Sequence, residues 1–225
     1  RYQQSETDLT VQLGGTTLNL QRVYDSLTRD REQTFGFGWR LANRDVAIEA
    51  NVPSTGREAL GAFNPFRVGT RVYLTLPDGR RVGYTFAPQR HEQTGVVYYT
   101  PAFESDPGVG GYQLDSADAV LSRAGDRFYE IKSGQPYHPA SGQFAGAEYT
   151  LTAPDGTVHY LSTADGVVEQ ALPTGERLFF SDSGVTHSNG ESVRFLRDSA
   201  GRITQLIAPD GKQVVFQALN DLYVM

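Results

Sequence analysis

The sequence predicts an all-β protein in which an antiparallel meander of hairpins forms a curved sheet or a partial shell of repeats. Short runs of alternating apolar and polar residues recur along the 225-residue chain. Glycine is abundant at 24 residues, and 12 Tyr and 12 Phe stand against a single Met. Aromatic side chains pack well on pleated sheets, and tight turns need glycine. No amphipathic helical pattern of any length interrupts these runs, so strands are expected throughout.

The segment Asp198–Phe216 is the best-defined unit of the meander. A turn at Ser199–Gly201 leads into an extended run, Arg202–Ala208, and Pro209–Gly211 turns the chain back into Lys212–Phe216. Proline presets φ for entry into a turn, and glycine supplies a positive φ without steric cost. Two β-rich runs around such a turn predict a hairpin.

Similar turns punctuate the first 146 residues. We expect two strands within Thr7–Tyr24 around Gly14-Gly15, one strand over Arg40–Ala50 with Leu41, Val46 and Ile48 on one face, and a hairpin of Arg67–Leu76 with Arg80–Phe86. Further strands are expected at Val96–Tyr99, Tyr112–Leu114, Ala119–Arg123 and Arg127–Ile131. The turn-rich segments are expected to be loops: Asn51–Asn64 (with one helical turn at Arg57–Leu60), Pro101–Gly111 and Lys132–Gly146.

From Glu148 onward the rhythm is regular. Glycines recur every six to eleven residues, and the predicted strands between them are Tyr149–Thr152, Val158–Leu161, Val167–Gln170, Arg177–Phe180 and Ser192–Leu196. This spacing predicts a continuous antiparallel meander. In the last hairpin Val214 and Phe216 face one side and Val215 the other, so further repeats or further chain are needed to cover both faces.

Composition narrows the function classes. The net charge of -6 argues against nucleic-acid binding, which usually needs a basic face. The chain has no cysteine, hence no disulfide and no thiolate metal site. No apolar run approaches the ~20 residues that span a bilayer, so membrane insertion is not expected. The chain starts at Arg1 without a leader pattern, and we expect it to be a fragment of a longer protein.

Two stretches resemble the RHS/YD-repeat proteins. Arg22–Ser26 followed by Phe35–Trp39 is similar to the family's N-terminal region, where an R-x-Y-x-S strand end precedes an aromatic residue, a glycine and a Gly-Trp pair. Asp198–Ile203 followed by Pro209–Lys212 is similar to the D-x-x-G-R-[IL] element and P-x-G turn of a YD repeat. The Y-x-Y-D element of the repeat is missing, since Val215–Asn220 stands in its place.

The resemblance implies a non-enzymatic structural scaffold. In bacterial toxins of this family a spiral of strands forms a shell around a toxic C-terminal domain, and related cell-surface proteins use a similar structure for adhesion. The implied location is secreted or cell-surface, and the implied partners are the rest of the polypeptide and an enclosed toxin domain, with no cofactor. Residues 1–225 would be one all-β fragment, subdivided into an N-terminal region (1–131) and a repeat-like meander (147–225) near the start of the shell.

No catalytic or metal-binding pattern stands out. The histidines are never at metal-ligand spacing, and we expect them to be surface or packing residues: His91, His138, His159 and His187. Gly108–Gly111 has no following lysine to hold phosphate. Asp106, Asp115 and Asp118 are close in sequence but lack the pattern of a calcium loop. The chain is therefore predicted not to be an enzyme.

Trp39 supports the main alternative, a carbohydrate-binding β-module or an accessory domain of a polysaccharide-active enzyme. Flanked by Phe35 and Phe37, it is a candidate to stack on a sugar ring. The same cluster is explained by aromatic rings packed against glycine backbone, and we favour that interpretation, with Trp39 as a buried anchor. A glycosidase with two carboxylates is a third alternative, for which no pair can be named.

The turn residues have a structural role in this interpretation. Each aspartate is expected to bond the backbone of its own turn, and each glycine to supply the positive φ: Asp78 and Gly79, Asp155 and Gly156, Asp210 and Gly211. Asp165 fits the same pattern more loosely.

Overall fold

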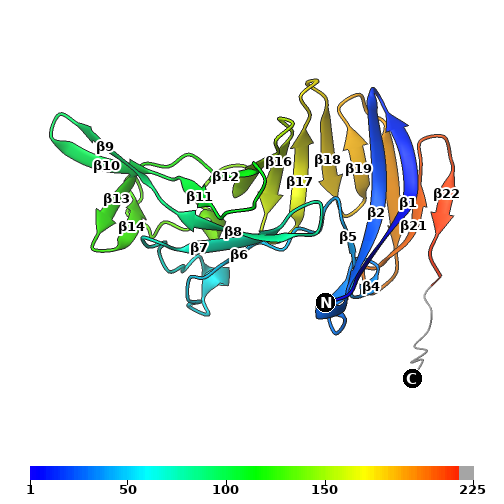
Figure 1. Ribbon diagram of the computed structural model, residues 1–225, viewed down its shortest axis with the longest axis horizontal. Coiled ribbons are helices and arrows are strands. Elements are labelled where there is room, and N and C mark those ends of the chain that lie inside the picture. The colour runs from blue at the N-terminus through cyan, green and yellow to red at the C-terminus, as the bar shows by residue number, and fades with distance from the viewer. Residues whose placement is uncertain (218–225) are drawn as a thin grey trace. The chain divides into compact units, whose positions relative to one another are not determined.

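The computed structural model describes residues 1–217, and within them it contains antiparallel β-sheets, three short 3-10 helices and no α-helix (Figure 1). The all-β prediction is confirmed. No described helix has the length and apolarity that crossing a membrane would require. The chain divides into two compact units, of which unit 1 comprises residues 1–45 and 174 onward and unit 2 comprises Val46–Pro173. These boundaries differ from those of the subdivision at 131 and 147.

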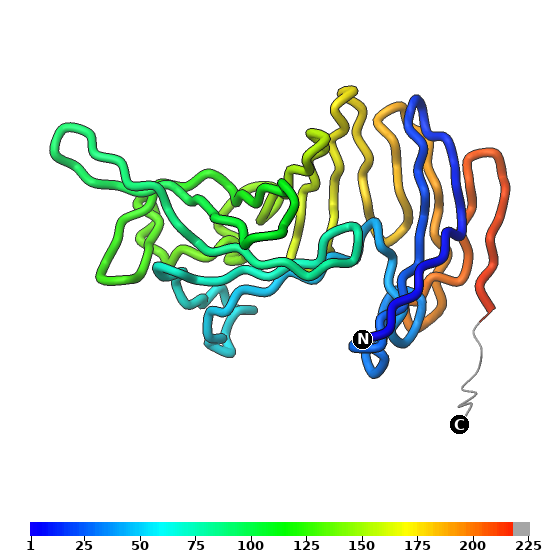
Figure 2. The backbone as a smooth tube through the Cα atoms, in the orientation of Figure 1, coloured from blue at the N-terminus to red at the C-terminus, as the bar shows by residue number. Residues whose placement is uncertain are grey.

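Unit 1 contains two principal sheets. One has the strand order β1-β2-β5, and the other runs through β18, β19, β20, β21 and β22 in chain order, a path visible in Figure 2. A two-stranded ribbon, β3-β4, completes the unit. The elements are β1 (Gln3–Leu13), β2 (Thr16–Asp25), η1 (Ser26–Thr28), β3 (Glu32–Gln33), β4 (Gly36–Phe37), β5 (Trp39–Leu41), β18 (Arg177–Ser181), β19 (Gly184–His187), β20 (Ser192–Arg197), β21 (Ile203–Ile207) and β22 (Gln213–Val215).

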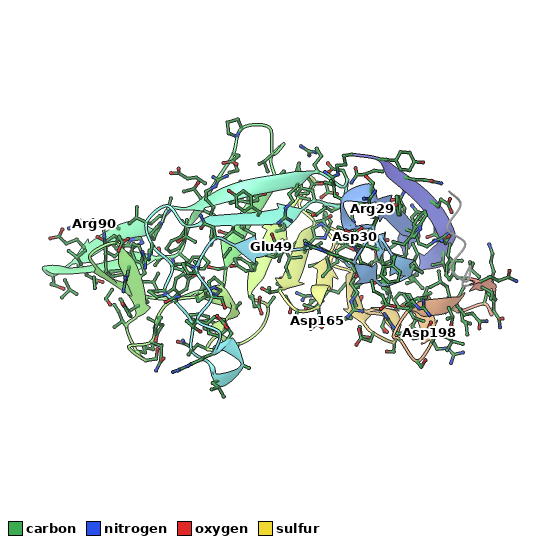
Figure 3. The ribbon with its side chains drawn as sticks, turned by 90° about the horizontal axis from the view of Figure 1, so that it is seen from below. Arg29, Asp30, Glu49, Arg90, Asp165 and Asp198 are labelled. Carbon is green, nitrogen blue, oxygen red and sulfur yellow. The ribbon has the colours of Figure 1, made fainter. Side chains whose placement is uncertain are left out.

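Alternation along the strands gives unit 1 a core that is mostly aliphatic, with Phe180 and Phe195 as its buried aromatic residues. Leu178 and Phe180 of β18 are buried while Phe179 between them is 43% exposed, as a period of two predicts. Residues directly opposite on neighbouring strands are buried together, for example Phe195 and Leu206. The sheet β1-β2-β5 packs over this face as a second layer (Figures 1 and 3).

Unit 2 contains three sheet segments, with strand orders β11-β8-β7-β6, β14-β13-β10-β9 and β12-β15-β16-β17. Its elements are β6 (Glu49–Ala50), η2 (Glu58–Leu60), β7 (Arg71–Thr75), β8 (Arg81–Phe86), β9 (Gln89–Gln93), β10 (Val96–Thr100), β11 (Phe103–Ser105), β12 (Gln113–Ser116), β13 (Leu121–Ala124), β14 (Arg127–Glu130), η3 (Pro139–Ser141), β15 (Tyr149–Thr152), β16 (Val158–Ser162) and β17 (Gly166–Ala171).

The core of unit 2 is built around Phe86, which is 1% exposed. Its ring lies 5.3–5.5 Å, centroid to centroid, from four other rings: Phe66, Phe103, Phe128 and Tyr137. Most of these contacts are edge-to-face or tilted, the arrangements that aromatic quadrupoles favour. The aromatic residues that the composition pointed to are therefore concentrated in this unit's core.

The three Pro-Asp-Gly turns share one geometry. In each, the glycine amide donates to the carbonyl three residues earlier at 2.9 Å. The aspartate Oδ1 accepts from the amide two residues later, also at 2.9 Å. The glycine φ angles are +84°, +89° and +87°. This is a three-residue hairpin loop, a tight turn followed by a left-handed glycine. The turns are those of Asp78 and Gly79, Asp155 and Gly156, and Asp210 and Gly211.

The single strand expected over Arg40–Ala50 is wrong. After β5 the chain makes a tight turn in which the Asp45 amide donates to the Leu41 carbonyl at 2.8 Å. The Asp45 carboxylate in turn accepts from the Leu41 amide at 2.7 Å. Leu41, Val46 and Ile48 are nevertheless all buried. Their spacing reflected burial but not an uninterrupted strand.

Candidate functional site

Trp39 lies on β5 and is half-buried, so it is not the fully buried anchor that we expected. Its strand partner is Tyr24 of β2, with ring centroids 5.4 Å apart. The guanidinium of Arg22 lies 5.1 Å from the Trp39 ring centroid. Arg22–Ser26 and Phe35–Trp39, the two parts of the first stretch that carries the resemblance, thus meet directly, and Arg22 occupies space over the indole.

Phe35 belongs to the same group of rings around Arg22 as Trp39, whereas Phe37 is exposed. Phe35 packs edge-on against Phe216 at 5.0 Å, whereas Phe37 is 55% exposed. Arg22 lies 5.8 Å from the Phe35 centroid and 4.7 Å from that of Phe216. A cation held among several rings is stabilised by their negative faces. The aromatic cluster therefore already encloses a cation of the chain itself.

Glycine permits this packing, as the sequence suggested. Gly38 has φ +74°, and a Cβ there would lie 2.7 Å from Cε2 of Tyr24. Its carbonyl accepts from the Asp25 amide at 3.0 Å. Backbone and ring are in close contact at this position, so a side chain at Gly38 would separate them.

The four histidines lie in separate environments. His91 stacks on Tyr98 with centroids 5.0 Å apart, and His159 and His187 are buried. His138 contacts the rings of Phe63 and Phe66, each at 4.9 Å. Burial lowers the pKa of His138 to about 4. Among residues 1–217 no group of three or more His, Cys, Asp or Glu side chains is placed to hold a metal ion.

The acidic residues considered as a calcium site are divided between two roles. Asp106 forms an ion pair with Arg71, whose Nη1 lies 2.7 Å from the carboxylate. The hydrogen bond from Arg71 holds the pKa of Asp106 below its ordinary value. Asp115 and Asp118 line a cleft instead. In the Gly108–Gly111 loop, the Gly108 carbonyl accepts from Arg80 at 2.8 Å, so this loop serves as a backbone acceptor.

The cleft of unit 2 is the strongest candidate binding site. It is broad and half open to solvent, and its floor is the outer face of β12, β15, β16 and β17. One wall is the chain just after β12, around Asp118 and Val120. Another is the Phe144–Glu148 segment before β15. Part of the long connection after Lys132 thus borders the cleft.

One row of side chains crosses the four strands of the floor. The register pairs Asp115 with Thr150, Thr150 with Tyr160 and Tyr160 with Glu169. All four line the cleft. Leu151 and Leu161, which follow Thr150 and Tyr160 by one position, are buried on the opposite face. The row places carboxylates at both ends, with a hydroxyl and an aromatic ring between.

Hydrogen bonds from the protein itself already engage two of the cleft carboxylates. Glu148 accepts from the Thr163 amide at 2.8 Å and from the Thr163 hydroxyl. Glu130 accepts from the Ser133 amide at 2.6 Å and the Lys132 amide at 3.1 Å. Desolvation raises the pKa of Glu130, but these hydrogen bonds outweigh it and leave that pKa below its ordinary value. Both side chains are therefore held in place by hydrogen bonds from nearby backbone amides.

Sequence reasoning missed this site. Asp115 was noted only for its sequence neighbours, and Tyr160 only as a member of a strand. The two residues belong to one row because of the strand register, which sequence alternation does not determine across separate hairpins. Each of the four residues has at least one apolar neighbour in the sequence, which indicates its face within a strand but not its alignment with the other strands.

Comparisons with known proteins add no family assignment. A scan against protein-family models finds no match, and a search of curated proteins finds none.

Proposed function

We propose that the chain is a non-enzymatic structural scaffold module, part of a large RHS/YD-repeat-like protein. In that protein it would form wall material of a toxin-enclosing shell or of a secreted or surface adhesion protein. The observation that carries the proposal is the repetition of one hairpin turn, with the same hydrogen bonds and glycine φ, in both units. A repeated unit that pairs with its neighbours extends a sheet by simple addition.

The two principal sheets of unit 1 each have an edge strand, and these two strands, β1 and β22, differ in their protection. β1 pairs only with β2 within the described residues, and it carries a register shift between Thr7 and Leu9. A bulge of this kind is a common protection of an edge against further pairing. The β1 edge is therefore protected against pairing with a further strand.

β22 lacks such protection. In the described chain it pairs only with β21, it has no register shift, and Val215 is 65% exposed. The Ala208 amide donates to the Lys212 carbonyl and the Phe216 amide to the Thr204 carbonyl, each at 2.8 Å. Alternation in an antiparallel ladder then directs the amides of Gln213 and Val215 away from β21. The scaffold proposal places the next hairpin there.

A glycan array tests this proposal against its rival, a carbohydrate-binding module. The scaffold proposal expects no specific glycan signal. Specific glycan binding that Trp39→Ala abolishes, with melting temperature and near-UV circular dichroism retained, would overturn it. Phe37→Ala is the matched control, because it removes an exposed aromatic ring two residues from Trp39 and leaves Trp39 in place. Arg22 over the indole is the physical reason to expect no sugar stacking on that face.

A further inference from the structure

The sheet β14-β13-β10-β9 ends in an exposed edge strand. Among the described residues β9 (Gln89–Gln93) pairs with β10 alone, its five residues follow without a register shift, and four of them are exposed. Figures 1 and 2 show the β9–β10 hairpin projecting from unit 2. An exposed edge offers its free backbone N–H and C=O groups to a further strand.

The turn at the end of the hairpin determines which backbone groups of β9 are free. Thr94 and Gly95 have φ of +49° and +78°, the signs of a two-residue type I′ turn, and Gln93 and Val96 pair across it. The two closing residues of such a turn hydrogen-bond to each other, so the Gln93 amide is directed towards β10. Going back along β9 from there, alternate residues face β10 and the others face outward.

The outward backbone groups belong to Arg90 and Glu92, which alternate with the residues bonded to β10. A hydrogen bond at the start of the strand agrees with this assignment, since the Ala87 amide donates to the Ala102 carbonyl at 2.9 Å in the same register. Pro88 has no amide, so the free edge begins after it. The edge is therefore short, and two residues of opposite charge define it.

The charges of these two residues lie on one face of the strand, because residues two apart share a face. Arg90 Nη2 and Glu92 Oε2 are 2.9 Å apart, and about half of each side chain is exposed. An exposed ion pair contributes little to the stability of the chain that carries it. Both groups are therefore accessible to charges across an interface.

A second copy of the chain matches this edge when two β9 strands pair antiparallel about a two-fold axis at His91. Arg90 of each copy then lies opposite Glu92 of the other, and each such pair exchanges both of its backbone hydrogen bonds. Opposite charges directly across two strands stabilise the pairing, and like charges destabilise it. An axis at Arg90 or at Glu92 would place two like charges opposite each other, so the charges select the axis at His91.

The side chain of His91 leaves room for this axis. Its ring stacks on Tyr98 with centroids 5.0 Å apart, and its Nε2 lies 2.8 Å from the Thr100 hydroxyl. Both partners belong to β10, so the ring lies over its own sheet and not beyond the edge. The backbones of two His91 residues can then approach as a pair without hydrogen bonds, with Cα atoms about 4.5 Å apart.

We propose that two copies of this chain associate through β9, and that antiparallel pairing joins their β14-β13-β10-β9 sheets into one continuous sheet. Only five residues of each copy form the seam, so the association is weak and reversible. The charges of Arg90 and Glu92 admit a second β9 and oppose strands of mismatched charge. The contact is separate from the β22 edge, where the scaffold proposal places the next hairpin.

Sedimentation equilibrium of the chain 1–225 measures the association. The average mass should rise from the 24.7 kDa of one chain towards twice that value as the concentration is raised from about 10 µM to about 500 µM. Salt at about 0.5 M should move this rise to higher concentration, because it screens the charges at the seam.

Charge reversal tests the pairing itself. Arg90→Glu gives each strand two acidic residues and Glu92→Arg gives it two basic ones, so each variant alone should associate at least about ten-fold more weakly. The two variants mixed in equal amounts should form a heterodimer, because every Glu then meets an Arg. Arg29→Glu makes the same charge change at an exposed arginine of unit 1 (Figure 3) and should leave the association unchanged. Circular dichroism and melting temperature verify that each variant is folded.

Three results would overturn the proposal. The first is a chain that remains monomeric over the whole concentration range. The second is association that Arg90→Glu and Glu92→Arg each retain, because this would place the contact at another edge, such as β22. The third is a mixture of the two variants in which no heterodimer forms.

Discussion

The hydrophobic cores of the two units are built from different kinds of side chain. Unit 1 joins two segments far apart in sequence and packs aliphatic faces of two sheets, with Leu18 and Leu20 on one and Leu178 on the other. Unit 2 is one continuous segment whose core centres on the ring of Phe86. The turn is the same in both, while the core is not. The hairpin turn thus acts as a common module, and the core residues distinguish the units.

The largest effect should come from removing the centre of the aromatic core. Phe86→Ala deletes a ring in contact with four others and should lower the free energy of unfolding by about 3–5 kcal/mol. Urea unfolding followed by tyrosine fluorescence measures the change. Phe179→Ala removes an exposed ring on the outer face of β18 and should cost well under about 1 kcal/mol. Similar losses for the two variants would contradict the assignment of Phe86 as the core centre.

Acid should destabilise unit 2 through His138. Its pKa is about 4 in the folded chain because of burial, against 6.5 ordinarily, so the folded state keeps this ring neutral. The stabilisation is complete above pH 6.5 and is lost as the pH falls towards 4, by up to about 3 kcal/mol.

The variant His138→Asn tests this pH dependence. Asn retains an acceptor for the Ala140 amide, which His138 Nδ1 now binds at 3.1 Å, but it does not titrate. Unfolding curves measured between pH 4 and 7 should have a smaller slope against pH than those of the unmodified chain. The slope of His159→Asn is measured alongside that of His138→Asn, because burial lowers the pKa of His159 as well. An unchanged slope in His138→Asn would show that folding does not lower the pKa of His138.

The smallest predicted effect is the cost of replacing a turn glycine by alanine, and this cost should be equal in the two units. Gly156 of unit 2 and Gly211 of unit 1 have φ of +89° and +87°. Alanine at either would meet no atom closer than 3.7 Å, so only backbone strain opposes it. Each substitution should cost about 1–2 kcal/mol, the penalty of a left-handed conformation for a residue with a Cβ. Thermal melts of both variants give the comparison, and clearly unequal costs would show that the turns are not one module.

Local chemistry explains what could be predicted. The Pro-Asp-Gly turns encode their own geometry, and the Gly14-Gly15 hairpin follows from alternation on each side, so β1, β2, β7, β8, β21 and β22 were all expected. β19 was missed because Gly184–His187 is short and weakly alternating, and it forms between β18 and β20. β9 was missed because Gln89–Gln93 is polar throughout.

The cleft could not be predicted because it depends on register and on loop position. Asp115 and Tyr160 are brought into one row by β15, whose pairing with β12 follows a connection of more than thirty residues. The Phe144–Glu148 wall lies at the end of that same connection, and its first residues fall in Lys132–Gly146, which the sequence predicted to be a loop or a domain boundary. Likewise the Gly15 amide donates a hydrogen bond to the Glu176 carboxylate at 2.8 Å across unit 1, and no local sequence pattern predicts this contact.

Hydrogen exchange at β22 tests the central claim, that hairpins of this kind add edge to edge. The chain 1–225 is compared, residue by residue, with an extended chain in which a second copy of the Asp198–Phe216 hairpin is joined after Phe216. The scaffold account predicts that the amides of Gln213 and Val215 exchange rapidly in the first and become protected in the second. The Val214 and Phe216 amides, directed towards β21, should be protected in both. Rapid exchange at Gln213 and Val215 in the extended chain, with Val214 and Phe216 still protected, would contradict the account.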